Sequence, residues 1–103
     1  MRQIFITLLL LLGLNLSAQE VKAYQLDNGT LKIEEFYSNG QLKQVSFYTG
    51  TVGVGVWLKY NEEGILVGKA KMENGRPIKL FRYEDGVTTI IDRKKNSITK
   101  IKQ

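Results

Sequence analysis

The segment Tyr37-Ser38-Asn39-Gly40 recurs as Tyr60-Asn61-Glu62-Glu63-Gly64 and again as Tyr83-Glu84-Asp85-Gly86, so that its tyrosines are spaced 23 residues apart. Recurrence at a fixed period of this length indicates stacked copies of one supersecondary unit. Most of the conspicuous residues are therefore expected to build that unit. The expected scaffold positions are Tyr37, Gly40, Gly55, Tyr60, Gly64, Gly75, Tyr83 and Gly86.

Turn signals separate the repeats at nearly regular intervals. Asn28-Gly29, Asn39-Gly40, Asn74-Gly75 and Asp85-Gly86 favour the positive φ angles of two-residue type I′ hairpin turns. The segments between turns alternate and contain many β-branched and aromatic residues, which predicts strands near 21–27, 30–38, 41–49, 54–61, 65–73, 77–84 and 87–92. Residues 93–96 are expected to form a turn, and Ile98 and Ile101 a last strand. No connection is long enough for a crossover, so the prediction is an all-β fold, a single antiparallel meander sheet of tandem β-hairpin repeats.

Residues 1–18 have the composition of an export signal. Arg2 gives the positive start, residues 4–14 form the apolar run, and Ser17-Ala18 offers small residues to the signal peptidase. The run is shorter than the roughly 20 apolar residues of a spanning helix, so no stable membrane span is expected after cleavage. The prediction is a helical signal peptide over 1–18, cleaved near Ala18, followed by one repeat domain over 19–103 in a secreted or periplasmic protein.

The chain contains neither histidine nor cysteine, which excludes a disulfide framework and thiolate metal sites. Glu34 and Glu35 are neighbours on a predicted strand, so their carboxylates are expected to point to opposite faces and not to converge on a substrate. The other acidic pairs fall in predicted turns. The glycines between Gly50 and Gly55 lack the Lys-Ser/Thr of a phosphate loop and favour a wide hairpin or a bulge. No catalytic residue, metal or cofactor is expected, and the protein is predicted not to be an enzyme.

Alternation along the predicted strands assigns side chains to two faces. One face is expected to hold Leu31, Ile33, Val54, Leu58 and Phe81, together with a ladder of the three repeat tyrosines with their rings side by side. The opposite face is the candidate binding face, because aromatic residues beside cations favour protein partners, carbohydrate or anionic surfaces. Its residues are Phe36, Lys43, Phe47, Trp57, Lys59 and Arg82. A simple solvated sheet face is the alternative.

The segment Gly55-Val56-Trp57-Leu58-Lys59-Tyr60-Asn61-Glu62-Glu63-Gly64 resembles the core of the MORN-variant repeats. The segments that start at Tyr37 and Tyr83 are similar to weaker flanking copies, so the resemblance covers about residues 26–90. Only the central copy has the Gly-x-Trp step, which Lys32-Ile33-Glu34 and Ile78-Lys79-Leu80 replace in the other two. Many members of this family are labelled as antitoxins of the YwqK type, and others are exported repeat proteins without an assigned role.

These features predict an exported, non-enzymatic β-repeat binding module that recognises a protein or an envelope component. Two alternatives remain open at this point. One is a structural repeat that self-associates through its strand edges, and the other is an antitoxin-like or immunity-like neutraliser of a partner protein. Nucleic-acid binding is suggested only by the sequence pI of about 9.5 and is disfavoured by the export signal.

Overall fold

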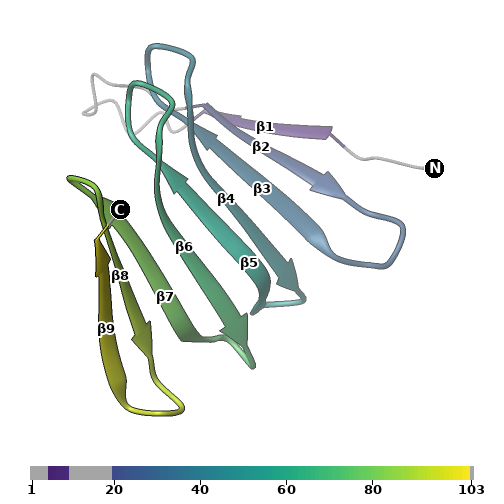
Figure 1. Ribbon diagram of the computed structural model, residues 1–103. Helices are drawn as coiled ribbons and strands as arrows, with labels where there is room; N and C mark the ends of the chain where they lie inside the picture. Colours follow the sequence, from purple (N-terminus) through teal and green to yellow (C-terminus); the bar gives the residue numbers. More distant parts are fainter. Residues whose placement is uncertain (1–4, 10–19, 103) are drawn as a thin grey trace.

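The computed structural model describes residues 5–9 and 20–102, and it shows one antiparallel sheet whose strand order equals the chain order (Figure 1). The predicted all-β meander is confirmed, with a last strand formed by the segment that contains Ile98 and Ile101. The sheet has nine strands, each paired with its neighbours in sequence, and eight of them lie within residues 20–102. They are β2 (Glu20–Gln25), β3 (Leu31–Phe36), β4 (Leu42–Thr49), β5 (Val52–Tyr60), β6 (Leu66–Glu73), β7 (Arg76–Glu84), β8 (Val87–Asp92) and β9 (Ser97–Lys102).

Of the predicted export signal the structure describes only β1 (Phe5–Leu9), which is antiparallel to β2. This segment is extended rather than helical. The free edge of β2 would otherwise present unpaired N–H and C=O groups, which any extended segment can satisfy. The rest of the predicted signal, including the cleavage position at Ala18, lies outside the described residues, so export and cleavage stay predictions. Within the described ranges, no helix is long and apolar enough to cross a membrane.

The turns at the Asn-Gly and Asp-Gly pairs are of two kinds. Asn74-Gly75 and Asp85-Gly86 are the predicted two-residue type I′ turns, with φ angles of 52° and 80°, and 52° and 76°. At Asn28-Gly29 and Asn39-Gly40 the type I′ prediction is wrong, because only the glycines have positive φ, 86° and 90°, and each loop is one residue longer. The cause is local. Asn28 Oδ1 accepts a hydrogen bond from Thr30 N at 3.0 Å, and Asn39 Oδ1 accepts one from Gln41 N at 2.9 Å, so each asparagine forms an Asx turn.

Hydrogen bonds between repeat-related loops hold the 23-residue period. The Tyr37 hydroxyl donates to the carbonyl oxygen of Tyr60 at 2.7 Å, and Asn39 Nδ2 donates to that of Glu62 at 3.0 Å. Both bonds join residues 23 positions apart. The first two tyrosines of the expected ladder therefore meet through a bond from hydroxyl to backbone and not through rings that lie side by side.

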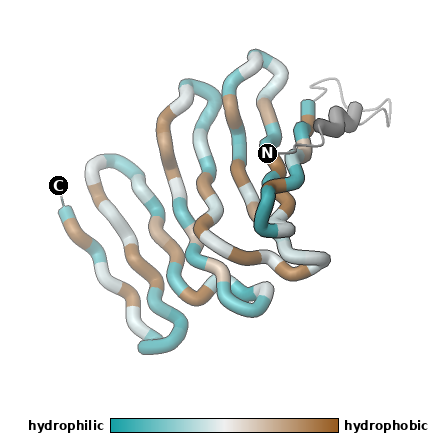
Figure 2. Tube along the Cα trace, turned by 90° about the vertical axis from the view of Figure 1, so that its right-hand side faces the viewer, coloured by the Kyte–Doolittle hydropathy of each residue, from teal (hydrophilic) through white to brown (hydrophobic). Residues whose placement is uncertain are grey.

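In the described residues the sheet is a single layer, and no other element of that part of the chain covers either face (Figure 2). Among the described residues, the only buried hydrophobic side chains are Ala23 and Val45, at 9% and 6% exposure. Ser46 and Thr88 are the buried polar residues. Antiparallel sheets usually pack one face on a core. Here the strands depend on cross-strand side-chain pairs and on the backbone ladder, and both faces remain open to a partner.

Tyr37→Phe tests the bond between the loops. The substitution keeps the ring but leaves the Tyr60 carbonyl without this donor, so the free energy of unfolding is expected to fall by about 1 kcal/mol. Urea unfolding monitored by circular dichroism measures the change. Tyr83→Phe is the matched control, because the Tyr83 hydroxyl has no comparable bond, and it is expected to change stability by less than about 0.5 kcal/mol. Equal effects of the two substitutions would contradict the assignment.

Candidate functional site

Cross-strand pairing shows which side chains share a face, because residues directly opposite each other project to the same side of a sheet. On one side, a row of apolar residues crosses five strands through direct pairs from β5 to β9. We call it the apolar row, and it consists of Trp57, Ala70, Leu80, Ile91 and Ile98. We call the side that carries it the tryptophan face.

A second row runs beside the first, two residues further along each strand. It contains three cations, Lys59 on β5, Arg82 on β7 and Lys100 on β9, separated by Gly68 and Thr89. We call these three residues the cationic row. All three are exposed, and none of them forms an ion pair with a described carboxylate.

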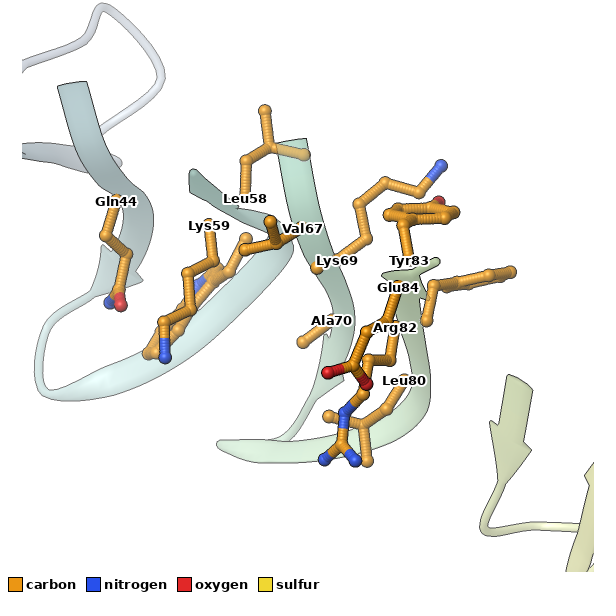
Figure 3. A pocket seen from close by; sticks show the side chains of 13 residues that line it. Gln44, Leu58, Lys59, Val67, Lys69, Ala70, Leu80, Arg82, Tyr83 and Glu84 are labelled. Atoms are coloured by element: carbon orange, nitrogen blue, oxygen red, sulfur yellow. The ribbon is translucent and has the colours of Figure 1, made fainter. Parts of the chain in front are cut away.

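Where the two rows cross β5, β6 and β7, the surface is hollowed over a volume of about 530 Å³. The hollow exists because, on the tryptophan face, β6 contributes only Gly68 and Ala70 between the larger side chains of its neighbours. Figure 3 shows Lys59, Leu80 and Arg82 on one side of these strands and Lys69 on the other. Gln44 and Glu84 also line the hollow, so its floor is apolar and its rim carries charged and polar groups of both signs.

The structure brings together only part of the candidate binding face. Trp57, Lys59 and Arg82 share the tryptophan face. Phe36 and Phe47 lie on the opposite face, since Phe47 pairs with Val54 and Lys32, while Lys22 Nζ lies 5.1 Å from the centre of the Phe36 ring.

The positions of Lys43 and of the pair Leu31 and Ile33 complete the comparison with the predicted faces. Lys43 lies where the register of β3 and β4 shifts, and its Nζ is 5.6 Å from the centre of the Tyr37 ring. Ile33 pairs with Ser46, which puts Ile33 and Leu31 on the tryptophan face and not with Leu58 and Phe81. The reason is that alternation fixes the two sides of one strand, whereas the match between strands depends on the register of their pairing.

Trp57 has a structural role within this face. The register of β4 and β5 shifts so that three residues of β5, Gly55 to Trp57, lie opposite Ser46, and Gly55 has a φ of 74°. Such a bulge interrupts the ladder. The indole Nε1 of Trp57 donates to the carbonyl oxygens of Val54 at 3.0 Å and Phe47 at 3.2 Å, so it replaces ladder donors there. The Gly-x-Trp step of the sequence is thereby explained as a bulge and its donor.

Packing around the indole ring leaves little freedom. The Tyr48 ring lies 5.2 Å from it, centre to centre, and a Cβ atom on Gly53 would come within 2.7 Å of its Cζ2. The ring is nevertheless only half-buried, because no second layer covers it. Trp57 is thus a rigid, partly exposed aromatic surface beside the hollow.

The opposite face is dominated by lysines that lie over aromatic rings. Lys69 Nζ and Lys79 Nζ are 5.0 Å and 5.9 Å from the centre of the Phe81 ring, and Lys71 pairs directly with Lys79. Cations over ring faces are attracted by the ring quadrupole. We call this side the lysine face. It gives a matched surface of the same charge sign against which the tryptophan face can be tested.

Several carboxylates of the described residues take part in ion pairs or turns. Glu34 lies 3.6 Å from Lys32 Nζ, on the face opposite to Glu35. Hydrogen bonds from the backbone N–H groups of Lys95 and Lys94 lower the pKa of Asp92, which holds the loop between β8 and β9. Burial, and then the charge of Glu34, raises the pKa of Tyr24. In the described parts of the chain, no three acidic side chains gather to hold a metal ion.

Trp57→Phe tests the hydrogen-bonding role of the indole. The substitution keeps an aromatic ring but removes Nε1–H from two carbonyl oxygens, so the free energy of unfolding is expected to fall by about 1–3 kcal/mol. Urea unfolding measures the change. Tyr48→Phe is the control, since it preserves the ring contact and removes a hydroxyl for which the structure gives no hydrogen bond, and it is expected to shift stability by less than about 0.5 kcal/mol. If the Trp57→Phe protein is as stable as the wild type, the indole hydrogen bonds do not stabilise the bulge.

Comparison with known proteins identifies no relative of this chain. No family model, no curated protein and no solved structure matches it. The resemblance to the MORN-variant repeats therefore depends on the quoted residues alone, and the function has to be argued from the two faces of the sheet.

Proposed function

We propose that this chain is an exported, non-enzymatic binding module that holds a protein partner on its tryptophan face. The observation that carries the proposal is the apolar row with its hollow, directly beside three exposed cations that form no ion pair with any described carboxylate. Monomeric proteins rarely leave such an apolar strip open beside charged groups unless it meets another molecule.

The chemistry of the face favours a protein as the partner. Trp and Arg are the residues that most often carry binding energy in protein interfaces, and here Trp57 and Arg82 flank the same hollow. The indole is fixed by its bonds to Val54 and Phe47, so little side-chain entropy is lost when a partner covers it. Export rests on the composition of residues 1–18, and the non-enzymatic assignment on the absence of His and Cys and on the separated carboxylates.

The resemblance to the MORN-variant repeats is compatible with this proposal. An antitoxin or immunity protein of that kind neutralises a partner by binding it, without chemistry of its own. If this chain has such a role, the export signal places the neutralised partner outside the cytoplasm.

A second candidate function is self-association, which the open edge of the sheet favours. Every residue of β9 is exposed, and its Ile98 and Ile101 are 69% and 47% exposed. An exposed edge strand presents a template for pairing with another chain. The lysines at positions 100 and 102 oppose such pairing between two copies of β9, because like charges would meet.

Charge reversal on the two faces tests the binding proposal. The protein is expressed from its full-length gene, purified after processing, immobilised and exposed to envelope extract, and bound proteins are quantified by mass spectrometry. Lys59→Glu with Arg82→Glu is expected to lower the recovery of the specific partner at least about tenfold, because opposite charges then repel. Lys71→Glu with Lys79→Glu changes the net charge equally on the lysine face, at positions that do not line the hollow, and is expected to leave recovery unchanged. Equal losses in both variants would contradict the assignment of the face.

Light scattering after size exclusion separates the two candidate functions. A binding module whose partner is another protein is expected to show the monomer mass across about a hundredfold range of concentration, since Lys100 and Lys102 protect the β9 edge. A mass that rises with concentration and returns to the monomer value in the Ile101→Lys variant would support self-association in its place.

A further inference from the structure

We propose that the partner presents an acidic amphipathic α-helix, which lies across the strands on the tryptophan face, from β5 to β9. This inference rests on the proposed function and names the chemistry of the partner. Three properties of the face lead to it: the spacing of the cations, the position of the apolar row beside them, and the lack of ion pairs between these cations and the described carboxylates.

The cationic row has a regular spacing because its members occupy alternate strands. Lys59, Arg82 and Lys100 are linked through Gly68 and Thr89 by direct cross-strand pairs. Neighbouring strands lie about 4.8 Å apart, so successive cations start about 10 Å apart along a line that crosses the strands. A ligand that meets all three therefore needs three negative groups at about this interval.

An α-helix supplies that interval with a simple sequence rule. Each residue rises 1.5 Å, so residues seven apart are separated by about 10.5 Å and lie on nearly the same side. Acidic residues at positions i, i+7 and i+14 would face Lys59, Arg82 and Lys100 in turn. An extended segment would need an acid at every third residue, and such residues point alternately toward and away from the sheet.

The apolar row gives the second contact of the helix. It runs about 7 Å from the cationic row, the separation of two residues along a strand. Apolar residues next to the acidic positions of the helix would cover Trp57, Leu80 and Ile98, which stand on the same strands as the three cations. Gly68 and Ala70 have no side chain or only a small one, so they leave space above β6. The hollow there has room for the largest apolar side chain of the helix.

Charge complementarity fixes the sign of the partner. The cationic row contains no carboxylate from β5 to β9, and its three side chains make no ion pair with the described acidic residues. Glu84 is the acidic residue that lines the hollow, two positions from Arg82 on the same strand. A basic helix would leave three like charges facing one another, whereas an acidic helix pairs all three.

The inference is tested by measuring how designed peptides bind to the protein, which is expressed from its full-length gene and purified after processing. The first peptide carries Glu at three positions spaced by seven residues and Leu at the adjacent inward positions. The second has Lys at the three positions, and the third is an extended segment with Glu at every third residue. Binding is followed by peptide fluorescence anisotropy and by the emission of Trp57, the only tryptophan of the chain, which is expected to shift to shorter wavelength as the helix covers it.

A charge swap provides the decisive comparison. The triple variant Lys59→Glu, Arg82→Glu and Lys100→Glu is expected to bind the Glu helix at least about tenfold more weakly and to gain affinity for the Lys helix. The triple variant Lys32→Glu, Lys71→Glu and Lys79→Glu, which alters the net charge by the same amount on the lysine face, is expected to bind the Glu helix like the wild type.

Failure of this inference differs from failure of the proposed function. If the Glu helix does not bind, or the extended peptide binds more tightly, while envelope capture still depends on Lys59 and Arg82, the helical partner is excluded and the binding face stands. If envelope capture is also indifferent to these residues, the face itself is excluded. Loss of Glu-helix binding in both triple variants would show attraction by net charge alone and would overturn the inference.

Discussion

The register between β4 and β5 depends on one side chain, the indole of Trp57. Its Nε1 donates to two carbonyl oxygens, those of Val54 and Phe47, at the point where three residues of β5 face one residue of β4. Without a donor there, the bulge would leave backbone acceptors unpaired, and a regular ladder with another register would compete with it. The bulge determines which residues of β4 stand opposite which residues of β5, and because it inserts two extra residues it keeps Trp57 and Lys59 on the same side as Gln44.

This dependence explains how much of the fold could be predicted from the sequence. Turn dipeptides and alternation predicted the strands and their antiparallel order, because both are local signals. Parity within β5 and β7 was also sufficient to group Trp57 with Lys59 and Leu80 with Arg82. What could not be predicted was the match between strands, which placed Phe36 and Phe47 on the lysine face, since it depends on how each bulge and turn shifts the pairing.

The two kinds of Asn-Gly turn show the same limit on a smaller scale. At Asn74 the backbone adopts the left-handed region and the turn has two residues, whereas at Asn39 the side-chain amide serves the loop instead. Asn39 caps its own turn with Oδ1 and reaches the neighbouring loop at Glu62 with Nδ2. The dipeptide is identical, and the stacking of loops one repeat apart goes with the longer form. A long-range contact of this kind is invisible to a local sequence signal.

A single-layer sheet has to solve a problem that a two-layer domain avoids, since hardly any of its side chains leave water completely. The chain solves it on the two faces in different ways. On the lysine face, long side chains lie along aromatic rings, as Lys69 and Lys79 do on Phe81, so apolar area is covered while the charges stay hydrated. On the tryptophan face, Gly68 and Ala70 are too small to cover their neighbours, and the apolar row remains partly exposed. On the tryptophan face, burial by another molecule would combine with pairing of three cations that form no ion pair with the described carboxylates, which is the physical reason to seek the function of this protein there.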